Sequence, residues 1–148
     1  MSNLTNKNIL LCVTGGIAAY KAAELVRLLK TSNAFVKVLM TKSAQEFITP
    51  LTMQALSGEK VHTDLLSTEA EAAMGHIELA KWCDLIVIAP CSANSLSKIA
   101  EGRGDDLLSA VCLATESEIF IAPAMNQAMW KDKSCLLYTS PSPRDSST

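Results

Sequence analysis

The sequence has 148 residues, enough for one domain with a sizeable core, and 49% of them are hydrophobic against 19% charged. A formal net charge of −2 argues against nucleic acid or an anionic membrane surface as a partner, so an anionic ligand must be held by local geometry. No apolar run reaches the roughly 20 residues of a membrane-spanning helix, and the first residues lack the layout of a signal peptide.

The five cysteines form no Cys-x-x-Cys pair, and their number is odd. Three of them lie in or beside apolar runs, where a free thiol behaves as a small hydrophobe. We expect buried free thiols in a cytoplasmic protein rather than disulfides or a metal site. The cysteines are Cys12, Cys83, Cys91, Cys112 and Cys135.

Short apolar runs alternate with helical patterns along the sequence. The run Asp84–Ala89 is apolar after its first residue and is stopped by Pro90, which is typical of a central strand covered on both faces. Strands that alternate with helices predict a doubly wound α/β fold, a parallel sheet between two layers of helices. We expect strands at Asn8–Val13, Phe35–Met40, Asp84–Ala89 and Glu118–Ala122, and helices at residues 17–30, from Ala44 to Pro50, and at Leu51–Leu56, Ser95–Ala100 and Leu107–Leu113.

The C-terminal stretch differs in character from the rest. From Cys135 onward there is no hydrophobic periodicity, and the last ten residues are mostly Ser, Thr and Pro, a composition typical of disorder. The stretch resembles the translated adapter tails of fragmentary assembled genes, and a natural flexible linker is the alternative. We therefore predict a domain over residues 1–134 and a non-native or disordered tail over residues 135–148.

The turns after the first two predicted strands favour a phosphate. In open parallel sheets, ligands bind beyond the carboxyl ends of the strands. Gly15 and Gly16 lead into a helix, whose free N–H groups suit a phosphate, although a merely tight turn is the alternative. The second strand ends in Thr41-Lys-Ser43, two hydroxyls and a cation, where an NAD site would carry an acidic residue; Ser43 as a helix cap is the alternative. Together the two turns favour a mononucleotide.

The remaining strand ends and one histidine add polar candidates. The segment Ser92–Ser95 offers hydroxyl and amide groups that suit a flavin, or else helix caps. Asn126, after the fourth strand, is a candidate for binding a substrate carboxylate. His76 is a candidate for moving protons near neutral pH, with a capping or surface histidine as the alternative. His62 is expected to be exposed.

Five segments together resemble the homo-oligomeric flavin-containing cysteine decarboxylases, from about Asn8 to Lys133. The Pro-x-Met-Asn-x-x-Met-Trp pattern combined with the histidine is specific for the decarboxylases within the wider flavoprotein group. The segments are Thr14-Gly-Gly-Ile-Ala-Ala-Tyr-Lys21, Thr41-Lys-Ser43, Gly75-His-Ile-Glu-Leu79, Ala89-Pro-Cys-Ser-Ala-Asn-Ser95 and Pro123-Ala-Met-Asn-Gln-Ala-Met-Trp130.

The resemblance implies a Rossmann-like flavoprotein fold, FMN as cofactor and no metal. It implies decarboxylation of 4′-phosphopantothenoylcysteine to 4′-phosphopantetheine, with His76 and Asn126 as catalytic residues. It also implies a homotrimer or an assembly of trimers, with FMN at the subunit boundaries. The implied FMN-binding residues are Gly15, Gly16, Ile17, Thr41, Ser43, Ser92, Ala93, Asn94, Ser95 and Ala124.

The sequence departs from this family after the Met129-Trp130 segment. Family members continue into a flap that covers the substrate and carries a cysteine for the reducing step, a role we do not assign to Cys135. We therefore expect this chain to bind FMN without completing turnover. The alternatives are a flavin prenyltransferase, a non-catalytic FMN-binding regulator, and an α/β domain for another nucleotide.

Overall fold

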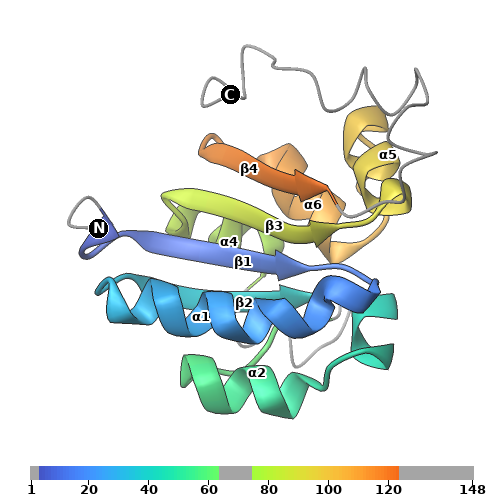
Figure 1. The fold of residues 1–148 in the computed structure, drawn as a ribbon. Coiled ribbons are helices and arrows are strands. Elements are labelled where there is room, and N and C mark those ends of the chain that lie inside the picture. The colour runs from blue at the N-terminus through green and yellow to red at the C-terminus, as the bar shows by residue number, and fades with distance from the viewer. Residues whose placement is uncertain (1–3, 64–74, 124–148) are drawn as a thin grey trace.

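The structure is a computed structural model that describes residues 4–63 and 75–123. Its four strands are parallel and lie in the order β2-β1-β3-β4 (Figure 1). The elements are β1 (Asn8–Val13), the 3-10 turn η2 (Ile17–Tyr20), α1 (Lys21–Thr31), β2 (Phe35–Met40), the 3-10 turn η3 (Ser43–Glu46), α2 (Pro50–Ser57), α4 (His76–Trp82), β3 (Leu85–Cys91), α5 (Ala93–Glu101), α6 (Leu107–Ala114) and β4 (Glu118–Pro123).

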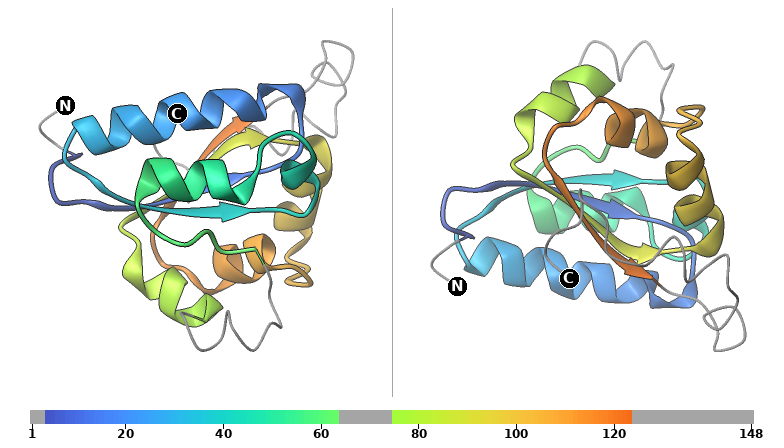
Figure 2. Two further views of the ribbon diagram at one scale, coloured as in Figure 1. Left: turned by 90° about the horizontal axis from the view of Figure 1, so that it is seen from below. Right: turned by 90° about the horizontal axis from the view of Figure 1, so that it is seen from above.

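The sheet separates two hydrophobic cores. Helices α1 and α2 cover one face, and α4, α5 and α6 cover the other (Figure 2). Strand β1 serves both cores, because alternate side chains point to opposite faces: Ile9 packs beneath α1, and Leu10 packs beneath α4 and α6. Both side chains are fully buried, which confirms the predicted doubly wound fold.

The order of the strands determines where a ligand site is expected. The chain moves from β1 to β2 on one side and then crosses to β3 on the other side of β1. The winding direction therefore reverses between β1 and β3. At such a reversal the two connections leave in opposite directions, and a crevice opens outside the carboxyl ends of the strands.

Most element boundaries follow local sequence signals. Thr49 caps α2, Pro50 occupies its first turn, and Gly58 ends it in a left-handed conformation with φ of 79°. The helix predicted over residues 17–30 begins instead as the 3-10 turn η2 and becomes α-helical at Lys21. Helix α4 was not predicted, because seven residues are too few for a helical period to stand out.

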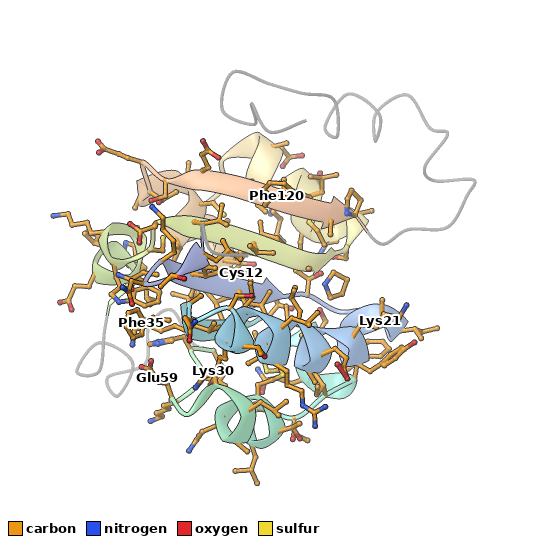
Figure 3. The ribbon with its side chains drawn as sticks, turned by 60° about the vertical axis from the view of Figure 1, so that its left-hand side comes forward. Cys12, Lys21, Lys30, Phe35, Glu59 and Phe120 are labelled. Atoms are coloured by element: carbon orange, nitrogen blue, oxygen red, sulfur yellow. The ribbon has the colours of Figure 1, made fainter. Side chains whose placement is uncertain are left out.

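Four cysteines are free and buried, as expected, and all of them lie in the core beneath α4 and α6. Figure 3 shows Cys12 between the helical layers. Burial raises the pKa of the Cys91 thiol to about 12, and burial next to Cys112 raises the pKa of Cys12 well above its ordinary value. Cys135 and the whole predicted tail lie outside the described residues.

Residues 4–63 and 75–123 contain neither a candidate metal site nor a candidate membrane-spanning helix. Within these ranges no three His, Cys, Asp or Glu side chains are grouped to hold a metal ion. No helix there is long and apolar enough to cross a membrane.

Candidate functional site

The exits of β1 and β2 touch each other. The Thr41 N–H donates to the Val13 carbonyl at 3.0 Å, which joins the two strands at their last residues. A Cβ atom at position 15 would lie 2.6 Å from Ser43 Oγ and 2.8 Å from Ser43 Cβ. Only glycine allows this approach, so Gly15 brings the first turn against the second. The two predicted phosphate turns therefore lie side by side.

The exits of β1 and β3 are joined through Thr14, which is fully buried. Its hydroxyl donates to the Pro90 carbonyl at 2.6 Å and accepts the N–H of Ser92 at 2.8 Å. Its own N–H donates to the same Pro90 carbonyl at 3.2 Å. Sequence reasoning missed Thr14. No local signal in the sequence marks this role, because it depends on the pairing of β1 with β3.

Thr41 and Ser43 carry the two hydroxyl groups that follow β2, and the sequence left open whether Ser43 is a helix cap or a ligand contact. Ser43 does not cap η3: the Thr41 hydroxyl accepts the Ala44 N–H at 3.3 Å instead. The Ser43 hydroxyl lies 3.4 Å from the Thr41 hydroxyl and is exposed. The helix-cap alternative for Ser43 is therefore wrong, and its hydroxyl remains available to a ligand.

Helix α5 begins directly at the exit of β3. Ser92 is its N-cap and accepts the Ser95 N–H at 3.1 Å, so the helix-cap reading of Ser92 is correct. Ser95 is 8% exposed, whereas Asn94 is exposed. The first turn of a nine-residue helix presents backbone N–H groups that lack intrahelical partners, and these favour an anion.

A cavity of about 540 Å³ lies between the end of β2 and the start of α5. It is open to solvent and contains hydroxyl, amide and lysine side chains. Two of its acidic groups are already paired, Asp106 with Lys98 at 3.6 Å and Asp105 with Arg103 at 3.5 Å. The lining residues from the predicted site are Thr41, Ser43, Asn94 and Ser95, and the others are Leu39, Met40, Lys42, Glu46, Thr63, Lys98, Asp105, Asp106, Leu107 and Leu108.

A second, smaller slot of about 210 Å³ lies beside the exits of β3 and β4, against α1. Its lining is apolar except for Lys21, which lies at the start of α1 (Figure 3). The apolar lining of this slot suits part of an aromatic ring. The lining residues are Ala18, Lys21, Ala22, Leu25, Ala89, Pro90, Ala122 and Pro123.

The structure does not bring His76 to the cavity. His76 is the first residue of α4 and is half-buried, and it is not among the residues that line the cavity between β2 and α5. His62, expected to be exposed, is instead half-buried and bridges to the edge of β2 through two backbone hydrogen bonds. Burial, followed by the charge of Lys37, lowers the pKa of His62.

The other predicted residues fall into two groups. The nine FMN-binding candidates within the described part of the chain all lie at the exits of β1, β2 and β3, and Ile17 among them is 82% exposed. Ala124 and Asn126 lie outside the described residues. With glycine, hydroxyl and backbone N–H groups at three neighbouring exits, the site suits a phosphate on a mononucleotide.

Comparison with known proteins finds related chains among curated proteins and solved structures. The coenzyme A biosynthesis bifunctional protein CoaBC of Haemophilus influenzae is 56% identical over 127 residues, which are 86% of this chain and 32% of the relative. The chain therefore spans about a third of the length of the curated relatives it matches.

The solved structures that match over most of both chains include two decarboxylases. The FMN-dependent cysteine decarboxylase SpaF has a TM-score of 0.82 and 31% identity, over 91% of this chain and 78% of its own. A mutant PPC decarboxylase complexed with pantothenoylaminoethenethiol has a TM-score of 0.72 and 34% identity, over 90% of this chain and 76% of its own. The Flavoprotein family profile matches residues 1–136. The chain therefore belongs to the Flavoprotein family.

Proposed function

We propose that this chain binds FMN and takes part in the decarboxylation of 4′-phosphopantothenoylcysteine to 4′-phosphopantetheine, a step of coenzyme A biosynthesis. One observation carries the proposal: glycine, hydroxyl and helix N–H groups from three strand exits converge at the reversal between β1 and β3. The names of the related proteins support the same cofactor and reaction.

The residues present fit the phosphate of FMN. The Gly15–Gly16 turn and the first turn of α5 offer backbone N–H groups, and Thr41 and Ser43 offer hydroxyls. A Cβ atom at position 16 would meet nothing within 4 Å, so the backbone of the first turn is open to a ligand. The remaining proposed contacts are Ile17, Ser92, Ala93, Asn94, Ser95 and Ala124.

The chemistry divides between the cofactor and the protein. Bound FMN would supply a reversible two-electron sink: it would take electrons from the substrate thiol so that the carboxylate can leave as carbon dioxide, and would return them to the decarboxylated product. We assign to His76 the movement of a proton and to Asn126 a hydrogen bond to the substrate carboxylate. Both assignments follow from the resemblance to cysteine decarboxylases.

A homotrimer, or an assembly of trimers, is part of the proposal. Within one chain His76 does not line the cavity at the strand exits, and this favours a histidine supplied to the site by a second copy. Apolar surface is available beside the exits, where Ile17 is 82%, Tyr20 60% and Leu51 72% exposed. Phe120, on β4, adds a side chain that is 44% exposed. We place the assembled protein in the cytoplasm, where its thiols stay reduced.

Titration with FMN tests the proposal, with riboflavin as the control that lacks the phosphate. We expect the full chain to quench FMN fluorescence and to bind riboflavin much more weakly. Addition of 4′-phosphopantothenoylcysteine without oxygen is then expected to bleach the visible absorbance of the bound flavin. A folded chain that ignores FMN would overturn the proposal. Binding of FMN with no bleaching, and no carbon dioxide release in air, would favour the non-catalytic regulator.

A further inference from the structure

The hydrogen-bond ladder between β1 and β3 is interrupted near the proposed cofactor site. Regular pairing between these strands ends at Cys12 and Ile88, and the pairing of β3 with β4 is irregular between Ile88 and Cys91. Beyond that pair the Thr14 N–H donates to the Pro90 carbonyl at 3.2 Å. The Thr14 hydroxyl adds a second hydrogen bond to this carbonyl and accepts the Ser92 N–H, because a hydroxyl can donate one hydrogen bond and accept others.

The contacts of Thr14 reach two parts of the site. The hydroxyl holds the Ser92 N–H at 2.8 Å, and the Ser92 side chain in turn caps α5 through the Ser95 N–H at 3.1 Å. On the other side, Thr14 is followed directly by Gly15 and Gly16, the turn that approaches Ser43. A single buried hydroxyl therefore lies between the glycine turn and the first turn of α5.

We propose that Thr14 is a positioning residue that fixes the distance between the glycine turn and the start of α5, and so sets the preference for phosphorylated flavin over riboflavin. The inference rests on the proposed FMN binding. Two groups of N–H donors bind one phosphate more tightly when their separation is fixed in advance, because donors that move must be ordered at the moment of binding, at a cost in free energy. Thr14 needs no contact with the ligand to have this effect.

The test compares Thr14→Val with a matched control in the full chain. Valine keeps the shape of threonine but removes both hydrogen bonds of the hydroxyl. Thr115 is the control, because it is also buried, at 3% exposed, and its hydroxyl donates to the Ala80 carbonyl at 3.1 Å and accepts the Ser117 N–H at 3.0 Å. Its contacts link the C-terminal part of α4 to the start of β4, away from the strand exits.

The measured quantity is the ratio of the dissociation constants of riboflavin and FMN. Each variant loses the hydrogen bonds of a buried hydroxyl, so we expect both to unfold at lower urea concentration than the parent chain. We expect Thr14→Val to lower the ratio by about tenfold, the effect of one charge-assisted hydrogen bond to a phosphate. Thr115→Val should leave the ratio unchanged, and Thr14→Ser, which keeps the hydroxyl, should restore it.

The outcomes separate this inference from the proposed function. If the parent chain prefers FMN and Thr14→Val keeps that preference, Thr14 has only a structural role and the inference is wrong. An equal fall of the ratio in Thr115→Val would have the same meaning. If the parent chain binds neither flavin, the proposed function fails first and the inference falls with it. Should Thr14→Val not fold, Thr14→Ala removes the same hydroxyl without adding a methyl group in its place.

Discussion

Ser43 occupies the space that a side chain at position 15 would need. A Cβ atom on Gly15 would lie 2.6 Å from Ser43 Oγ and 3.3 Å from the Ser43 carbonyl carbon. The glycine is therefore required by its neighbour across the sheet, and not only by the geometry of its own turn. Since Ser43 follows β2 and Gly15 follows β1, this one contact sets the spacing of two strand exits.

We predict that Gly15→Ala destabilises the fold by about 1–3 kcal/mol, the usual cost of overpacking, and weakens FMN binding. Urea unfolding and fluorescence titration measure the two effects. Ser43→Gly removes the two atoms closest to the new methyl group, so the double variant should regain most of the stability. Equal costs of Gly15→Ala with and without Ser43 would contradict the steric explanation.

Ser92 caps α5 and is also a proposed phosphate contact, and a negative charge at this position should affect the two roles differently. Ser92→Asp keeps a good N-cap, and its charge is favourable at a helix N-terminus, so we expect stability to be unchanged or raised by a few tenths of a kcal/mol. FMN binding should weaken, because a carboxylate repels the phosphate, while riboflavin binding stays as it was. Gln54→Glu on α2 adds the same charge away from the strand exits and serves as the control. Unchanged FMN affinity in Ser92→Asp would place the phosphate elsewhere.

The pKa of the Asp106 carboxyl predicts that this group stabilises the fold by an amount that depends on pH. Burial on its own would raise the pKa of Asp106, but hydrogen bonds from Ser109 and the charge of Lys98 outweigh it and hold the pKa below its ordinary value of 3.8. A lowered folded-state pKa contributes stability above the ordinary value, and this contribution is lost as the pH falls through the folded-state pKa.

We therefore expect Asp106→Asn to melt at a lower temperature than the parent chain at pH 7, with a gap that closes below about pH 4. Asparagine still caps α6, so the comparison isolates the charge. Lys98→Gln removes the paired cation and should narrow the gap at neutral pH. Thermal unfolding at several pH values measures this difference in melting temperature between the variant and the parent chain. A difference of the same size at pH 3 and pH 7 would argue against the ionised carboxylate as the cause.

The four buried thiols should be inert in the native protein. Burial raises the pKa of Cys12, Cys83 and Cys91, so the reactive thiolate is scarce even at mildly alkaline pH. In a Cys135→Ser variant, we expect a thiol reagent to label nothing within minutes at pH 8 and to label four residues in denaturant. Rapid labelling of the native variant, located by mass spectrometry, would show that the core beneath α4 and α6 opens readily.

The strands could be predicted because each is a short apolar run, but the predicted stops were wrong by one or two residues: β3 continues through Pro90 to Cys91, and β4 includes Pro123. The short helix α4 could not, because its pattern covers barely two turns. The general rule for parallel sheets indicated the strand exits as the place of a site, because it needs only the strand ends. The individual FMN contacts there come from the resemblance and stay predictions. Thr14 did not follow, because its role depends on the pairing of β1 with β3, and no local pattern records that partnership. His62 was misjudged for the same reason, since its bridge to β2 is a tertiary contact.

The strand order also determines when during folding a flavin can be bound. The contact between Val13 and Thr41 closes a loop of 28 residues, whereas the one between Thr14 and Pro90 closes a loop of 76. The longer closure costs about 1 kcal/mol more in chain entropy, so the unit formed by β1, α1 and β2 should assemble before β3 docks. The proposed site is complete only after that docking. FMN is therefore expected to slow unfolding of the finished protein and to leave the early steps of folding unaccelerated.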